Sequence, residues 1–150
     1  DREDVVGYSL YYDDNTALRY DHPCLWRNGT AIDLGMPEGY RDGLAKDINN
    51  AGVIVGVGTH YGSPNDGARN HALIWQDGVV QELNDLVPAD CGFVLGFATG
   101  INDSGQIAAF GYDGTHSHAL LLTPVPEPPS ALALAAALAS CGLWHKTRKG

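Results

Sequence analysis

The sequence has few basic residues. Lys and Arg total 9 against 18 Asp and Glu, and the formal net charge is −9. Three of the basic residues, Lys146, Arg148 and Lys149, stand together at the C-terminal end, so the rest of the chain is more acidic still. Nucleic-acid binding needs Lys and Arg to meet the phosphates. The composition therefore argues against a nucleic-acid partner.

An initiator methionine and an N-terminal signal peptide are also missing. Residues 1–4 (DRED) are charged, where a signal peptide would carry apolar residues. We expect either that a signal was removed or that the chain is a fragment of a longer protein. The absence therefore does not favour the cytoplasm.

Cysteine is scarce, with three residues in the chain. Cys141 lies in an apolar C-terminal segment. Cys24 and Cys91 either pair in an oxidising compartment or serve as two small buried apolar residues. The sequence leaves both alternatives open, because it does not show whether their Cα atoms are close enough for a disulfide.

Catalytic motifs are lacking as well. No Ser-His-Asp arrangement stands out, and residues 56–58 (GVG) lack the third glycine and the helix of a phosphate-binding loop. Residues 102–105 (NDSG) superficially resemble a calcium loop, without its alternating oxygen ligands or distal Glu. His116 and His118 have the best metal-ligand spacing, yet His118 shares a repeat position with other histidines, which favours a structural role. We expect no enzyme activity, no cofactor and no metal.

What the sequence does contain is glycine and short apolar runs. Nineteen glycines favour turns over helices. Residues 71–75 (HALIW) and 79–83 (VVQEL) predict two strands, and residues 76–78 (QDG) predict a tight turn between them. No segment before Pro126 keeps a 3.6-residue apolar period. The sequence predicts an all-β fold.

The chain repeats itself. Residues 8–21 and 57–70 have equal length but little similarity, and we predict variable loops there. Residues 47–54 match residues 100–107 at an offset of 53 (101 − 48), and a partial third copy begins at His118. At an offset of 49 (71 − 22) the matched positions are Val6/Val55, Gly7/Gly56, His22/His71, Trp26/Trp75, Gly29/Gly78 and Leu34/Leu83.

Each unit offers about four short strands, which is the pattern of a β-propeller blade. We predict a repeat domain over residues 1–124, with units at about 5–52 and 53–105 and a partial unit at 106–124. Four-stranded antiparallel units of this kind would make a partial β-propeller-like stack. About three repeats are usually needed for independent stability, so we expect these to be the last blades of a longer protein.

The recurring segments resemble a known repeat family. Residues 22–26 (HPCLW) and 71–75 (HALIW), each followed by a glycine turn and then by residues 48–52 (INNAG) or 101–105 (INDSG), are similar to the HAF-type extracellular repeat. The resemblance covers residues 5–122. Pro23 and Cys24 depart from its pattern, as does Leu122 at the tryptophan position of the third copy. It implies an extracellular, propeller-like protein whose molecular activity is largely undefined.

The C-terminal segment, residues 125–150, has a different composition. Pro126, Glu127 and Pro128 interrupt the β pattern, because proline fixes φ and removes a backbone donor. The uncharged, Ala- and Leu-rich residues from Ala131 to Trp144 predict an apolar α-helix. Its 14 residues (144 − 131 + 1) fall short of the roughly 20 that span a bilayer.

This order of Pro-Glu-Pro, apolar segment and basic end resembles the PEP-CTERM sorting signal. The resemblance implies recognition of Pro126, Glu127 and Pro128 by an exosortase-type membrane transpeptidase of Gram-negative bacteria, often found beside exopolysaccharide genes. The helix from Ala131 to Trp144 would hold the substrate in the inner membrane. Lys146, Arg148 and Lys149 would stay in the cytoplasm as a basic stop. The alternative is a plain C-terminal membrane anchor.

Taken together, we expect an exported, non-catalytic protein of the bacterial cell surface or extracellular matrix, processed at its C-terminal signal. Its repeats would bind a polysaccharide or another surface protein, or fill a structural role. Tyr8, Tyr11, Tyr12 and Tyr20 fall in one predicted loop, and aromatic loops often stack on sugars. The alternative function is that of terminal blades in a larger propeller hydrolase or lyase, with its catalytic residues upstream.

Overall fold

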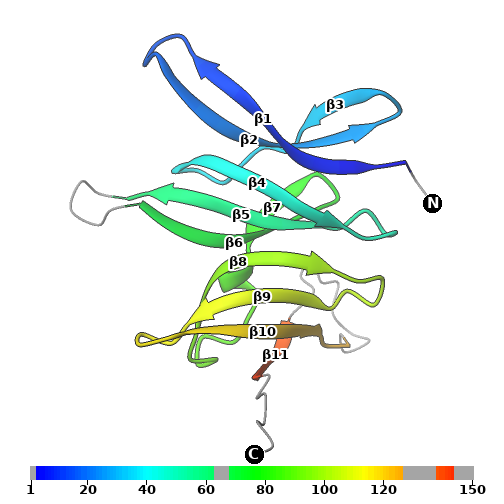
Figure 1. Ribbon diagram of the computed structural model, residues 1–150. Helices are drawn as coiled ribbons and strands as arrows, with labels where there is room; N and C mark the ends of the chain where they lie inside the picture. Colours follow the sequence, from blue (N-terminus) through cyan, green and yellow to red (C-terminus); the bar gives the residue numbers. More distant parts are fainter. Residues whose placement is uncertain (1–2, 63–67, 127–137, 144–150) are drawn as a thin grey trace, which may run out of the picture.

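The structure is a computed structural model that describes residues 3–62, 68–126 and 138–143. In these residues the chain is β-structure almost throughout (Figure 1), which confirms the predicted all-β class. The elements are β1 (Val5–Asp13), β2 (Leu18–Arg27), β3 (Thr30–Asp33), β4 (Tyr40–Ile48), β5 (Ile54–Tyr61), β6 (Ala68–Gln76), β7 (Val79–Glu82), the 3-10 helix η1 (Leu83–Asp85), β8 (Val94–Ile101), β9 (Ile107–Tyr112), β10 (Ser117–Pro124) and β11 (Leu138–Leu143).

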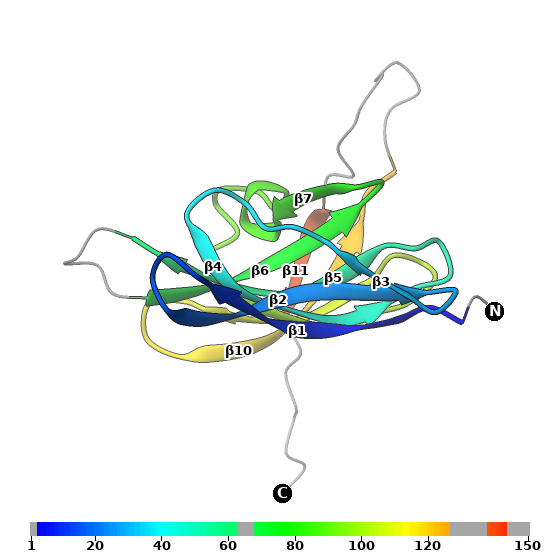
Figure 2. The same ribbon diagram turned by 90° about the horizontal axis from the view of Figure 1, so that it is seen from above.

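The strands form three antiparallel sheets, each built from strands that follow one another in the chain. We call them the first sheet (β1-β2-β3), the middle sheet (β4-β5-β6-β7) and the last sheet (β8-β9-β10-β11). The middle and last sheets each have four antiparallel strands, and the first sheet has three. The first and last sheets lie at opposite ends of an open stack (Figure 1), and the sheets overlap when the stack is viewed from above (Figure 2).

Short turns close the outer hairpins at matching places in the first two sheets. Asn28 and Gly29 join β2 to β3 with φ values of 51° and 74°, and Asp77 and Gly78 join β6 to β7 with 52° and 78°. Two successive positive φ angles suit the right-handed twist of a hairpin, and Asn-Gly and Asp-Gly tolerate them best. The predicted turn at residues 76–78 is confirmed.

Two apolar cores hold the three sheets together. A hydrogen bond adds to this packing: the Trp75 indole N–H donates to the Gly35 carbonyl at 2.9 Å, and Gly35 lies in the link between β3 and β4. The core between the first and middle sheets contains Leu25, Tyr40, Ala45, Ile54, Leu73 and Trp75. The core between the middle and last sheets contains Val55, Ala72, Ile74, Leu83, Leu95, Ala98, Ile107, Ala109, Leu120 and Leu122.

The Ile-Asn-x-x-Gly segments form the turns from β4 to β5 and from β8 to β9. In each turn the asparagine side chain accepts a hydrogen bond from a backbone N–H four residues later: Asn49 from Val53 at 3.0 Å and Asn102 from Gln106 at 2.9 Å. The same residue therefore closes the same turn in both copies, a local use of asparagine that disfavours regular strand.

The two turns also bond to each other. Asn50 donates from its backbone N–H and from its side chain to the Asp103 carboxylate, at 2.9 and 2.7 Å. Asn49 donates to the Asn102 carbonyl at 3.2 Å. Beside them, the Asp47 carboxylate accepts from the Ile101 N–H at 2.8 Å. We call this set the turn ladder; it joins the middle and last sheets outside their apolar core.

The loops predicted at residues 8–21 and 57–70 are largely strands. β1 and β2 pair without a break from Val5↔Trp26 to Asp13↔Leu18, and β5 and β6 pair as far as Tyr61↔Ala68. The loop prediction was wrong because these strand ends extend beyond the cores. In β1, side chains on both faces are exposed from Tyr8 to Tyr12, which removes the alternation that marks a half-buried strand.

The predicted apolar helix from Ala131 to Trp144 is wrong over residues 138–143. That segment is β11, which pairs antiparallel with β10 from Leu120↔Leu143 to Pro124↔Leu138. An open strand edge offers unpaired N–H and C=O groups, and this non-local pairing outweighs the weak helix preference of Ala and Leu. Residues 131–137 and Trp144 lie outside the described residues. In the part of the chain that is described, the structure has no apolar helix of membrane-spanning length.

Candidate functional site

Most of the predicted sorting-signal residues lie outside the described part of the chain. Pro126 is described, and it is exposed two residues after the end of β10. The residues that fall outside are Glu127, Pro128, Ala131, Trp144, Lys146, Arg148 and Lys149. The structure therefore leaves the proposed recognition motif and the basic stop as sequence-based predictions.

The histidines at the repeat position each bond to a carboxylate. In the first two sheets the acid follows its histidine by 11 residues (33 − 22 and 82 − 71) and lies on the neighbouring strand. In the last sheet the acid comes from the turn before β10. The pairs are His22 Nδ1 with Asp33 at 3.2 Å, His71 Nδ1 with Glu82 at 2.7 Å, and His118 Nε2 with Asp113 at 2.8 Å.

The middle sheet builds the most complex of these sites, from Tyr40, His60, His71 and Glu82; we call it the Tyr40 cluster. The buried Tyr40 at the start of β4 places its hydroxyl 2.8 Å from His71 Nδ1, and that hydroxyl also donates to Glu82 Oε1. His71 bonds to the other carboxylate oxygen of Glu82. The His60 ring stacks on the His71 ring, with 6.2 Å between centroids.

These contacts set the protonation of the cluster. Burial, and then the hydrogen bond to Glu82, raise the pKa of Tyr40, so its hydroxyl keeps its proton. Burial alone would raise the pKa of Glu82, but the hydrogen bonds from Tyr40 and His71 outweigh it, and the pKa of Glu82 lies below its ordinary 4.5. Glu82 is therefore an anion held by a donor on each oxygen.

Tyrosine, histidine and glutamate can all act in general acid–base catalysis. Here the three side chains are hydrogen-bonded to one another. Both carboxylate oxygens of Glu82 already accept a hydrogen bond from within the cluster. Tyr40 is 8% exposed and packs in the core between the first and middle sheets. These hydrogen bonds connect β4, β6 and β7.

Sequence reasoning placed the histidines together but missed Tyr40 and the acid partners. The recurring 11-residue spacing from histidine to acid was a signal that could have found Asp33 and Glu82. Tyr40 has no comparable signal, because it comes from a strand 31 residues before His71 (71 − 40). Phe93 occupies the corresponding place beside His118, with 5.3 Å between ring centroids, and it lacks a hydroxyl.

Three of the residues weighed for metal binding bond to other groups: Asn102, Asp103 and His118. Asn102 closes its own turn, and Asp103 receives two hydrogen bonds from Asn50. Within residues 3–62, 68–126 and 138–143, no three His, Cys, Asp or Glu side chains are grouped to hold a metal ion. Cys24 and Cys91 are free thiols, and burial raises the pKa of Cys24.

Exposed aromatic side chains lie along both faces of the β1–β2 hairpin. Tyr8, Tyr11 and Tyr12 are exposed on β1. The guanidinium of Arg41 lies 6.0 Å from the centre of the Tyr20 ring and 5.8 Å from that of Tyr61. The four tyrosines predicted in one loop are thus on two paired strands, and three of them stand open to solvent.

Comparisons with known proteins give this arrangement no relative: no family model, no curated protein and no solved structure matches the chain.

Proposed function

We propose that this chain is the repeat and sorting region of an exported, non-catalytic protein of the bacterial cell surface or extracellular matrix. Its sheets would be blades of a partial β-propeller of the HAF-repeat type. Its tail would be a PEP-CTERM sorting signal, processed by an exosortase-type enzyme. The chain would be held at the inner membrane before processing and reside at the surface or outside the cell afterwards.

One observation carries the non-catalytic part of this proposal: the repeated polar residues bond to one another at equivalent places in successive sheets. The histidine–acid pairs recur in all three sheets, and the asparagine turns recur in two. A catalytic group is normally needed once, at a site open to substrate. Recurrence in every unit is instead what a scaffold requires.

The sorting part rests on the sequence of residues 125–150. The tripartite order of Pro-Glu-Pro, apolar segment and basic end stands as predicted from the sequence. Engagement of residues 131–144 by the membrane requires residues 138–143 to leave the edge of β10, since one segment cannot occupy both places. On this proposal the paired and membrane-bound forms of the tail are alternatives.

The partner we favour for the repeat region is a polysaccharide or a protein of the same extracellular layer. The exposed tyrosines on β1 support this, because aromatic rings are common platforms for sugars and for protein interfaces. The acidic composition still argues against nucleic acid.

The test is the intact mass of the chain, expressed with an export signal in hosts with and without an exosortase-type peptidase. Peptidase-dependent loss of the segment after residues 126–128 is expected. Glu127→Ala should abolish that loss, while Glu38→Ala, which changes an exposed acid in the repeat region, should leave it unchanged. An uncut product in both hosts would reduce the tail to a membrane anchor and refute the sorting proposal.

A further inference from the structure

The two end faces of the stack carry exposed apolar side chains. On the first sheet, Val6 and Leu25 pack toward the middle sheet. Neighbouring residues of a strand point to opposite faces, so Val5 and Trp26, which pair across β1 and β2, face away from the stack. Tyr11 and Leu18 are exposed on the same two strands. We call this surface the first end face.

The internal repeat shows what such a face does elsewhere in the molecule. Val5 corresponds to Ile54 at the offset of 49 (54 − 5), and Trp26 corresponds to Trp75. Ile54 and Trp75 are each 3% exposed, because the first sheet packs on them. Val5 is 61% exposed. The same position of the repeat is buried in the middle sheet, which packs on the first, and exposed on the first of the three described sheets.

In the last sheet the opposite face of the repeat is exposed. Its inward residues, such as Ile107 and Leu122, are buried against the middle sheet. On the other side, Phe110 is 48% exposed, whereas its counterpart Val57 (110 − 53) is 5% exposed. Leu121 is 45% exposed, and its counterpart Ile74 (121 − 47) is 8% exposed. We call this outward surface the last end face.

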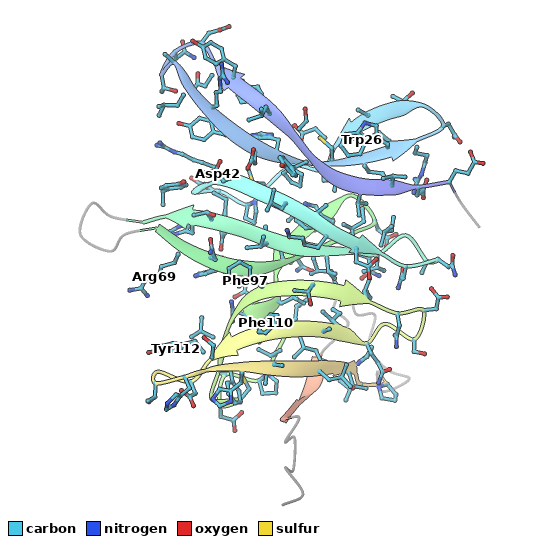
Figure 3. All side chains as sticks on the ribbon, in the orientation of Figure 1. Trp26, Asp42, Arg69, Phe97, Phe110 and Tyr112 are labelled. Atoms are coloured by element: carbon cyan, nitrogen blue, oxygen red, sulfur yellow. The ribbon has the colours of Figure 1, made fainter. Side chains whose placement is uncertain are left out.

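The last end face extends over three strands. Phe97 on β8 pairs with Phe110 on β9, and Val94 pairs with Tyr112, so these side chains lie on one side of the sheet. All four are exposed. Figure 3 labels Phe97, Phe110 and Tyr112 on this sheet and Trp26 on the first sheet, at the other end of the stack. No charged residue is among them.

We propose that the last end face of one chain docks on the first end face of a second copy. The two internal junctions are the template. In each, the face of one sheet that points toward the C-terminal end of the stack packs on the opposite face of the next sheet. The exposed end faces are the same two surfaces of the repeat, and within the described residues no further sheet covers them. A second copy supplies both at once, in the order in which the chain already stacks them.

Such a contact is head-to-tail, and this makes it testable by complementation. A head-to-tail interface uses two different surfaces, so blocking either one on every chain prevents assembly. A chain blocked on its first end face still has an intact last end face, and the converse also holds. Two variants that each fail to assemble alone should therefore bind each other. The proposal does not rest on the sorting signal.

The experiment uses the full chain and measures its weight-average mass by light scattering and sedimentation across a concentration series. The wild type should rise from its monomer mass of 16.0 kDa to at least twice that value. The double variants V5K/Y11K and F110K/L121K should each lose this rise, and an equimolar mixture of the two should form a one-to-one dimer. All four positions are exposed, so the sheets should tolerate the changes.

Val79→Lys is the matched control, because it changes a similarly exposed valine on β7 of the middle sheet. This variant should associate like the wild type, and circular dichroism should show unchanged folding in every variant. A wild type that stays monomeric throughout would overturn the proposal. So would blocked variants that still associate alone, or a mixture of folded variants that fails to form the dimer.

Discussion

Tyr40 takes part in two kinds of interaction, apolar packing and hydrogen bonding. Its ring belongs to the core between the first and middle sheets, and its oxygen donates to Glu82, which His71 also binds. A polar group buried this deeply is tolerated only when it is hydrogen-bonded. Tyr40 thus ties the apolar packing between sheets to the histidine–acid pair within one sheet.

Removing this hydroxyl should destabilise the protein most at neutral pH. Tyr40→Phe should lower the free energy of unfolding by about 1.5 kcal/mol, the low end for a hydrogen bond to a charged group, since Glu82 is a quarter exposed. The pKa of Glu82 is depressed in the folded state. Its contribution is therefore present above its unfolded value of 4.5 and is lost as the pH falls through the folded pKa.

Urea unfolding of wild type and Tyr40→Phe, at neutral pH and well below pH 4.5, measures both effects. The difference between the two proteins should shrink at the lower pH. Tyr12→Phe serves as the control, because it removes a hydroxyl from an exposed tyrosine and should change little at either pH. A difference that is equal at both pH values would show that the charge of Glu82 does not contribute.

The asparagine turns show which parts of a repeat can be predicted from sequence. Their positions follow from the Ile-Asn-x-x-Gly pattern, because the asparagine side chain and the glycine act within their own turn. The pairing of Asn50 with Asp103 spans 53 residues. Only the three-dimensional stacking of the two turns brings these residues together, so no local sequence pattern predicts this contact.

The turn ladder should respond to charge at Asn50. Asn50→Asp would place a carboxylate beside that of Asp103, whose pKa is already lowered mainly by the hydrogen bonds from Asn50. The thermal unfolding midpoint should fall, and added salt should reduce the loss, since exposed charges are screened. The double variant N50D/D103N exchanges the two side chains and should recover part of the stability. Absence of both recovery and salt dependence would argue against the contact.

The outer strands are the part of the fold that the sequence did not predict correctly. β11 consists of residues whose local preference is helical, and its strand structure comes from pairing with β10. The far ends of β1 and β2 carry exposed side chains on both faces, so alternation fails as a signal there. The hairpin turns and the inner strands could be predicted because glycine and burial mark them locally.

At the scale of the whole molecule, three sheets form an open stack in which β11 covers the outer edge of β10. Among the residues whose side chains the structure describes, the two apolar cores are built from residues between Val6 and Leu122. Removing the tail should therefore leave the three sheets folded and uncover one strand edge. Exposed strand edges are sites where other chains can pair.

Deletion of residues 127–150 tests this expectation by hydrogen exchange. Amides of β10 that bond to β11 should lose protection, while those that bond to β9 should keep it, as should the strands of the middle sheet. The intact chain is the reference. Exchange that accelerates equally in all three sheets would instead mean that β11 is required for the folding of the stack.

The repeated turns also have a consequence for how such a gene changes over time. An unequal crossover between the coding segments for residues 48–52 and 101–105 would insert or delete 53 residues (101 − 48). Each junction would still encode an Ile-Asn-x-x-Gly turn. An inserted sheet would meet its neighbours through the same faces that the present sheets use. Related genes should then differ by whole sheets, with few length changes inside the turns themselves.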